Sequence, residues 1–322
     1  MRFTITTLLI AIFGMSAMAQ QQQIHRCYTT QVIEKMNETY PGYKVAVEQT
    51  FQAAKERAQL KSSSQDIYRI PVVVHIVYNT NEENLPDSIV QNQIDVLNED
   101  YRRRNADTTE TRAEFKPVAG DAGIEFYLAD TDPDGNSTTG ITRTQTSETS
   151  WLGVSSFIPE GIKQSAEGGK DAWPTDKYLN IWVGNLSLFG SPFILGFAYP
   201  PTGAPNWPTG QEAPADSLEG VVVHYEVFGR NNPLASGPLT ATNQGRTCTH
   251  EVGHYLGLRH IWGDGGGFSG TDGCTVDDGI DDTPNASDAS QQQCNWNQNS
   301  CTDTPVDHPD MIENYMDYSD EN

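Results

Sequence analysis

The sequence predicts an α/β fold of the mixed (α+β) kind: a twisted β-sheet, a helix carrying a histidine motif, and an irregular C-terminal lobe. Three observations predict it. Apolar, β-branched runs and one amphipathic helical pattern occupy residues 66–225. A second helical pattern lies near residue 250. Residues 263–310 are rich in Gly, Asp, Asn, Thr and Pro and show neither helical nor strand periodicity. We therefore expect disulfide bonds or bound ions to stabilise that lobe.

The elements follow in the order strand, helix, strands, helix, which favours a mixed sheet. The helix has an apolar stripe and Ser88 as its expected N-cap. The last but one strand is bounded by Gly190 and by Pro200-Pro201, as an edge strand is. The expected strands are 68–78, 124–128, 179–183, 195–199 and 220–225, and the expected helix is 88–103.

The N-terminus has the pattern of an export signal. Arg2 precedes an apolar run, and Ala17 and Ala19 provide the small residues that a signal peptidase recognises, so we expect residues 1–19 to be removed and the protein to be secreted. The alternative is a membrane anchor, but the run is short for a bilayer. No later segment is long and apolar enough to insert.

Residues 20–61 read as a separate segment before a domain that spans 62–322. Apolar residues recur with helical spacing around Val32 and Val47, yet the segment is too small for its own core. Basic residues and the Ser62-Ser63-Ser64 run at its end suit a cleavable prosegment. The alternative is a helical extension that stays attached.

The charge balance is strongly acidic, with 43 Asp and Glu against 20 Lys and Arg, a formal net charge of −23. This argues against nucleic acids and anionic membranes as partners. The excess of carboxylates serves solubility, or it binds hard cations such as Ca²⁺.

The motif around residue 250 predicts a zinc site. On a helix, His250 and His254 project from nearly the same face, and Glu251 lies beside them without reaching the metal. Gly257 can end the helix in the left-handed conformation, so that His260 approaches from outside. Three imidazoles with one open position are typical of catalytic zinc. The other histidines in strand patterns, His75 and His224, are expected to be packed core residues.

The motif and the later Asn314-Tyr315-Met316-Asp317-Tyr318 resemble the pappalysin family of the metzincin clan. The resemblance implies a zinc metalloendopeptidase whose partners are protein or peptide substrates. It implies that Glu251 is the general base, that Met316 forms an apolar floor beneath the metal in the Met-turn (residues 314–318), and that Tyr318 stabilises the oxyanion. The alternatives are a catalytically dead binding module, which would be expected to lack Glu251 or a histidine, and a zinc enzyme with a non-peptide substrate.

Five cysteines leave at least one thiol unpaired within the chain. Cys27 lies in the expected prosegment, and we expect it to ligate the zinc in a latent zymogen; the alternative is an idle or intermolecular thiol. The resemblance implies a disulfide between Cys274 and Cys301, and a partner for Cys294 beyond Asn322. Cys248 is expected to be a buried thiol.

The resemblance also suggests two further sites. The acidic loop 277–283 predicts structural Ca²⁺, with Asp278 and Thr283 as ligands and Asp281 as a further one; the alternative is a solvated loop. Asp320 and Glu321 follow the Met-turn, and the resemblance implies that a carboxylate there selects Arg or Lys after the cleaved bond, the P1′ position. The alternative is that both carboxylates are solvated near a chain end.

Overall fold

The structure is a computed structural model that describes residues 24–60, 66–153, 158–204, 207–266, 271–290 and 294–320. The expected signal peptide and Glu321 lie outside the described residues. Within the part of the chain that is described, no helix is both long and apolar enough to cross a bilayer.

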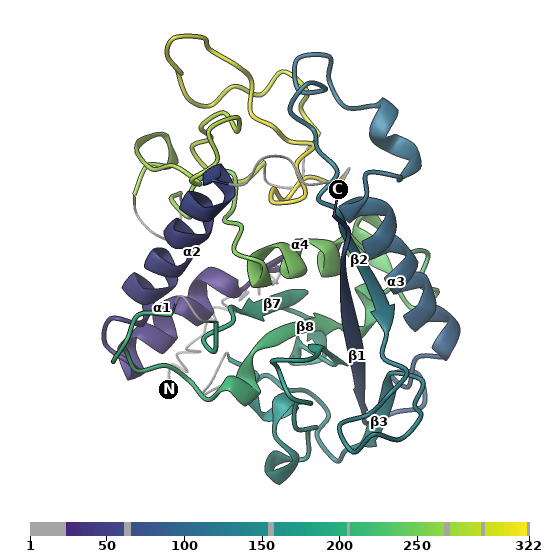
Figure 1. Cartoon of the computed structure of the whole chain (residues 1–322). Helices are drawn as coiled ribbons and strands as arrows, with labels where there is room; N and C mark the ends of the chain where they lie inside the picture. The colour runs from purple at the N-terminus through teal and green to yellow at the C-terminus, as the bar shows by residue number, and fades with distance from the viewer. Residues whose placement is uncertain are drawn as a thin grey trace, which may run out of the picture.

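A six-stranded sheet of mixed direction forms the centre of the molecule, as the sequence predicts (Figure 1). Its order is β2-β1-β4-β8-β7, and β3 pairs with the second half of β1, next to β2. All pairs are parallel except β7–β8, so β7 is an antiparallel edge strand. The strands are β1 (Tyr68–Tyr78), β2 (Ile124–Leu128), β3 (Ile141–Gln145), β4 (Leu179–Gly184), β7 (Gly196–Tyr199) and β8 (Gly220–His224).

Two helices cover one face of this sheet, α3 (Asp87–Tyr101) and α4 (Arg246–Tyr255). The predicted stripe of α3 is buried there through Val90, Ile94 and Leu97, in one core with Val252 of α4. The predicted cap is wrong, because the helix begins at Asp87 and its N-cap is Pro86. The backbone of Pro86 is extended, which places the helix start directly after it. The carboxylate of Asp87 stabilises this start because it lies at the positive end of the helix dipole. Ser88 therefore lies inside the first turn.

The N-terminal segment, residues 24–60, covers part of the other face (Figure 1). It forms α1 (Thr29–Thr39) and α2 (Tyr43–Leu60). The buried side chains of Val32, Met36 and Tyr43 pack into one core with Trp182 and Phe197 of the sheet. The segment therefore has no core of its own and is held by burial against the domain, at about 1.5–3 kcal/mol for each large apolar side chain.

Shorter elements connect these parts. A hairpin of β5 (Ser187–Leu188) and β6 (Ser191–Pro192) leads into the edge strand. The 3₁₀ helices are η1 (Ala106–Thr109), η2 (Glu160–Lys163), η3 (Ser165–Glu167), η4 (Asp216–Leu218), η5 (Tyr225–Val227), η6 (Gly237–Thr242) and η7 (Gly273–Thr275).

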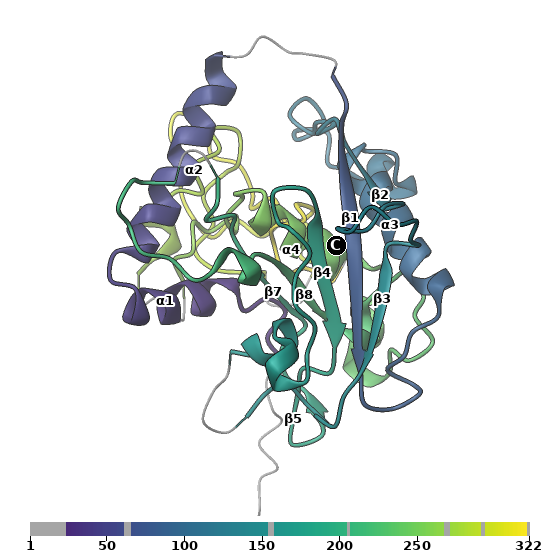
Figure 2. The same ribbon diagram turned by 60° about the horizontal axis from the view of Figure 1, so that its bottom comes forward.

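The lobe after α4 is irregular, as expected, and η7 is its one regular element within the described residues. Cys274 and Cys301 are joined, with their Cα atoms 5.4 Å apart. A small core of Ile261, Trp262 and Met316 fills the lobe. Figure 2, turned from the first view, shows this lobe beside α2, on the α4 side of the sheet.

The predicted core histidines are fully buried. The ring of His75 contacts Thr142 and Asn180, and the ring of His224 accepts the amide hydrogen of Leu186. Neither ring belongs to the histidine cluster described below.

Candidate metal centre and active site

The three motif histidines converge on one point. His250 and His254 project from α4, which ends at Tyr255. Gly257 then takes a left-handed conformation with φ of 100°, and the chain returns so that His260 reaches the same point. Together with the thiol of Cys27, the ligand atoms of these residues lie within 4.8 Å of one another. The predicted helix end and the approach of His260 from outside it are therefore seen in the geometry.

The hydrogen bonds of the rings show that this cluster fits a metal ion. The Nδ1 atoms face three acceptors: the carbonyl of Tyr315 at 2.6 Å, the carbonyl of Leu258 at 2.9 Å and Oδ1 of Asp264 at 2.5 Å. Each Nδ1 must carry the proton to donate, so each Nε2 presents a lone pair.

The Nε2 atoms of His250 and His260 lie 3.0 and 3.1 Å from that of His254, with no proton left to bridge them. Burial lowers the pKa of His250 well below its usual value and that of His254 to about 3, so these rings are neutral. Three converging lone pairs repel one another unless a cation lies between them, and Zn²⁺ is the cation that prefers such a set.

Asp264, which no motif in the sequence singled out, orients the ring of His260. Burial alone would raise its pKa, but the hydrogen bond and the charge of His260 lower it to about 2. A carboxylate four residues after the last histidine was the available signal, in a region where acidic residues are common.

Glu251 lies beside the cluster and is completely buried. Burial raises its pKa to about 8, although hydrogen bonds from Thr29 and Cys27 oppose the shift. The hydroxyl of Thr29 donates to Oε2 at 2.9 Å, while Oε1 has no hydrogen-bond partner among the described residues. A buried carboxylate that has a raised pKa and one oxygen without a hydrogen-bond partner is suited to accept a proton and to donate it again.

The Met-turn lies beside the histidine cluster. The hydroxyl of Tyr318 lies 3.0 Å from Nε2 of His260, and burial raises its pKa well above the usual value. Met316 is buried against α4 at Gly253, where an added Cβ would come within 2.6 Å of its sulfur. The helix and the turn therefore pack closely at Gly253.

The edge strand is covered by the N-terminal segment, which runs parallel to it. The amide of Leu195 donates to the carbonyl of His25 at 2.9 Å, and the amide of Tyr28 donates to Gly196 at 2.9 Å. The hydroxyl of Thr29 accepts the amide hydrogen of Ala198 at 2.8 Å. The segment thus occupies the strand positions that an extended peptide would use, with Cys27 at the histidine cluster.

Arg26, which no motif in the sequence singled out either, lines a small pocket beside the cluster with Tyr318 and Ser319. Its guanidinium pairs with Asp320 and donates to the carbonyl of Ser319 at 3.1 Å. Burial lowers its pKa to about 10, partly opposed by the charge of Asp317, so it remains charged at neutral pH. Its position next to Cys27 was the only signal in the sequence.

The predicted calcium ligands come together only in part. Asp278 accepts the amide hydrogen of Ile280 at 2.8 Å and is hydrogen-bonded to Thr283, and burial raises its pKa to about 7. Asp281 instead has its side chain 85% exposed and pairs with Lys55 of α2. Within the described ranges, the one group of three or more Asp, Glu, His or Cys ligands is the histidine–cysteine cluster.

Comparisons with known proteins agree with this geometry. The sequence profile of the peptidase M43 family, described as pregnancy-associated plasma protein-A, matches residues 163–322. An extracellular metalloprotease of Arthroderma otae is 30% identical over 251 residues, which are 78% of this chain and 70% of that protein.

The chain belongs to the pappalysin family. An extracellular metalloprotease of Arthroderma benhamiae is 29% identical over 85% of this chain and 79% of its own length. Among solved structures, a promirolysin mutant of Tannerella forsythia is 38% identical with a TM-score of 0.71, covering 91% of this chain and 86% of that one. Mature mirolysin in complex with a cleaved peptide is 43% identical with a TM-score of 0.66, covering 80% and 85%.

Membership confirms the predicted family, the metzincin-type fold and the zinc metallopeptidase activity. Such an enzyme needs ligands for a metal, a group that accepts a proton and a sheet edge for the peptide, and the residues described above are of the kinds that provide these.

Proposed function

We propose that this pappalysin is a secreted endopeptidase made as a latent zymogen. Residues 1–19 are the signal peptide, 20–61 the prosegment and 62–322 the catalytic domain. The curated relatives are named extracellular metalloproteases, and one structural neighbour is a proenzyme. In this chain, the proposal of latency is supported by the position of the N-terminal segment, which lies along the edge strand and over the histidine cluster.

Catalysis then follows from the groups around the cluster. His250, His254 and His260 would hold the zinc ion, and the bound ion would supply Lewis-acid chemistry to a water molecule and to the scissile carbonyl. Glu251 accepts the proton of the attacking water and passes it to the leaving amine. The hydroxyl of Tyr318 donates a hydrogen bond to the carbonyl oxygen as it becomes negatively charged.

Latency follows from the same contacts. Cys27 is buried at the histidine cluster, where its sulfur would hold the metal's fourth position as a thiolate. Thr29 adds a second contact, because its hydroxyl bridges the general base and the amide of Ala198. Removing the segment would free both the metal's open position and the edge of β7 for an extended substrate.

The pairing of Arg26 with Asp320 carries the proposal for specificity. The cation lies one residue before Cys27, in a pocket bounded by the Met-turn residues Tyr315 and Tyr318. A partly buried carboxylate favours a guanidinium that can donate several hydrogen bonds to it. We infer that Asp320 selects Arg or Lys at P1′ and that Arg26 occupies the same pocket in the zymogen. Glu321 remains a second prediction.

A peptide library tests this specificity. Cleavage by the mature enzyme, read by mass spectrometry, should give new N-termini enriched in Arg and Lys. Asp320→Asn should lose most of this enrichment and still cleave. Glu321→Gln tests the second candidate, because a loss of enrichment in that variant alone would assign the selection to Glu321 instead. New N-termini without basic enrichment in the wild-type enzyme would reject the proposal.

We also propose that the loop of Asp278, Thr283 and Asp281 binds structural Ca²⁺. The support is the half-buried carboxylate of Asp278, whose pKa is raised to about 7 because burial disfavours its charged form. Ca²⁺ takes carboxylate and other oxygen ligands in flexible loops. Asp281 would have to leave Lys55 to join such a set.

A further inference from the structure

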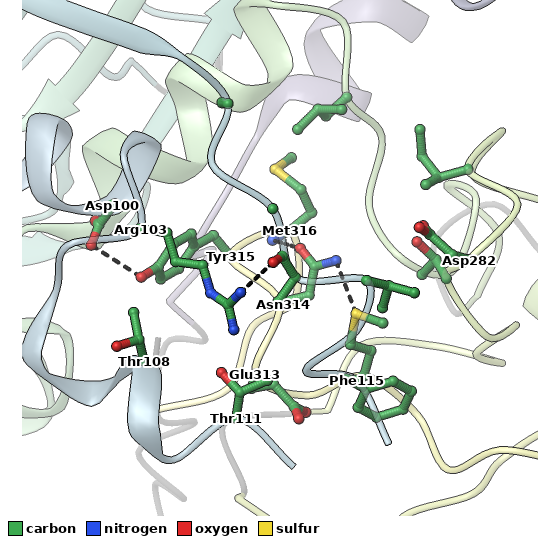
Figure 3. A pocket seen from close by; sticks show the side chains of 18 of the residues that line it. Asp100, Arg103, Thr108, Thr111, Phe115, Asp282, Glu313, Asn314, Tyr315 and Met316 are labelled. Atoms are coloured by element: carbon green, nitrogen blue, oxygen red, sulfur yellow. Dashed lines mark hydrogen bonds between the residues drawn. The ribbon is translucent and has the colours of Figure 1, made fainter. Parts of the chain in front are cut away.

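Behind the histidine cluster, a buried carboxylate joins three separate parts of the chain. Asp100 lies in the last turn of α3, and its side chain is completely shielded from solvent. One oxygen accepts the hydroxyl hydrogen of Thr249 at 2.7 Å, and the other accepts that of Tyr315 at 3.0 Å. Figure 3 shows Asp100 facing Tyr315, with Met316 next along the turn.

Both partners of Asp100 are connected to His250, one through the chain and one through a hydrogen bond. Thr249 precedes His250 in α4. The carbonyl of Tyr315 accepts from Nδ1 of His250 at 2.6 Å, which fixes the tautomer that leaves Nε2 for the metal. The position of Tyr315 is therefore set at both ends, by Asp100 at its hydroxyl and by His250 at its carbonyl.

The surroundings make this arrangement rigid. The hydroxyl of Tyr101, next to Asp100 on α3, donates to the carbonyl of Thr249 at 3.0 Å. The guanidinium of Arg246 lies 5.1 Å from the centre of the Tyr315 ring and 3.7 Å from Asp100, and it also pairs with Asp107. The last turn of α3 thus holds the start of α4 and the Met-turn against each other.

We propose that Asp100 is a positioning residue for the zinc site. By holding the hydroxyls of Thr249 and Tyr315, it fixes the ring of His250 and the approach of the Met-turn. It touches neither the metal nor the substrate, so its effect reaches the reaction through His250. This inference rests on the zinc site of the proposed function.

Two substitutions and one control test the inference. Asp100→Asn removes the charge and one of the two acceptors while keeping the volume. Tyr315→Phe removes only the hydroxyl that Asp100 accepts and leaves the carbonyl that His250 requires. Asp107→Asn is the control, because Asp107 pairs with the same Arg246 but accepts its hydrogen bond from Asn105, whereas Asp100 accepts from Thr249 and Tyr315.

The readouts are zinc affinity by competition with a chelator, the visible spectrum of the Co²⁺-substituted enzyme, and kcat and KM on one peptide. Loss of a partner outside the ligand set typically weakens metal binding by about 10- to 100-fold. We expect Asp100→Asn and Tyr315→Phe each to weaken zinc binding roughly tenfold and to shift the Co²⁺ spectrum. We also expect kcat to fall with little change in KM. Asp107→Asn should resemble the wild type.

The double variant of Asp100→Asn and Tyr315→Phe should bind zinc no more weakly than the weaker single variant, because both changes break one connection. Tyr315→Phe alone carries the test if Asp100→Asn does not fold. Wild-type zinc affinity and kcat in both single variants would overturn the inference, and so would an equal loss in Asp107→Asn. A wild-type protein that binds no zinc would refute the zinc site itself instead.

Discussion

Replacing Arg26 by Ala should weaken the hold of the N-terminal segment on the cleft by a measurable amount. Arg26 is the residue whose side chain pairs with Asp320 and donates to Ser319. Its side chain is 13% exposed and that of Asp320 is 33% exposed, so solvent screens the pair only partly. A hydrogen bond to a charged group contributes about 1.5–3 kcal/mol, and we take this range for the whole contact because of that exposure.

That range corresponds to an equilibrium constant for docking of the N-terminal segment that is lower by about 10- to 100-fold, since 1.4 kcal/mol is a factor of ten. The assay is hydrolysis of a fluorogenic peptide by freshly purified precursor, together with the lag before autolytic processing. Arg26→Ala should raise the initial rate and shorten the lag. Arg26→Lys should lie between it and the wild type, because the charge stays and the forked donor geometry is lost.

Lys35→Ala is the matched control. It removes one positive charge from the same segment, but Lys35 pairs with Glu38 within α1 and both side chains are more than half exposed. Its precursor should behave as the wild type. A precursor of Arg26→Ala with unchanged initial rate and lag would refute the reasoning that this pair closes the pocket.

Three further predictions concern the segment and the acidic loop. The precursor of Cys27→Ala should activate faster than the wild type, because the metal's fourth position loses its thiolate; an unchanged lag in the same assay would contradict this. Thr29→Val should also shorten the lag, since it removes the hydroxyl that bridges Glu251 and Ala198. Thr29→Ser retains the hydroxyl and should show the wild-type lag. Equal lags in the two variants would contradict a role of this hydroxyl in holding the segment. Chelation of Ca²⁺ with EGTA should lower the melting temperature of the wild type but not that of Asp278→Asn, and a melting temperature insensitive to EGTA in the wild type would reject the calcium site.

The parts that the sequence predicted well depend on local periodicity. Strands β1, β2, β4, β7 and β8 have apolar runs, and the repeat of a single helix places His250 and His254 on one face. β3 was missed because Ile141–Gln145 alternates with exposed polar residues and carries little apolar signal. The start of α3 was misplaced because a proline and an acidic first turn took the role expected of Ser88.

The parts that could not be predicted are contacts between distant segments. Arg26 meets Asp320 across 294 positions, and Thr29 meets Glu251 across 222. Asp100 reaches Thr249 across 149 positions. No spacing rule links such pairs, because the tertiary fold alone brings them together. The edge strand was predicted from its flanking glycine and prolines, and only the structure shows that the chain's own N-terminal segment pairs with it.

The central claim is that a carboxylate beside three metal-binding imidazoles performs the proton transfers of peptide hydrolysis. The most direct measurement compares the zinc content and peptide turnover of Glu251→Gln with those of the wild type, both freed of the N-terminal segment by an added protease. Glutamine keeps the shape of the side chain but cannot accept the proton, and general acid–base catalysis contributes about 10²- to 10⁴-fold. We predict one zinc ion per chain in both proteins and a fall in kcat of at least about 100-fold in the variant. Near-normal turnover by a zinc-loaded Glu251→Gln enzyme would contradict the account.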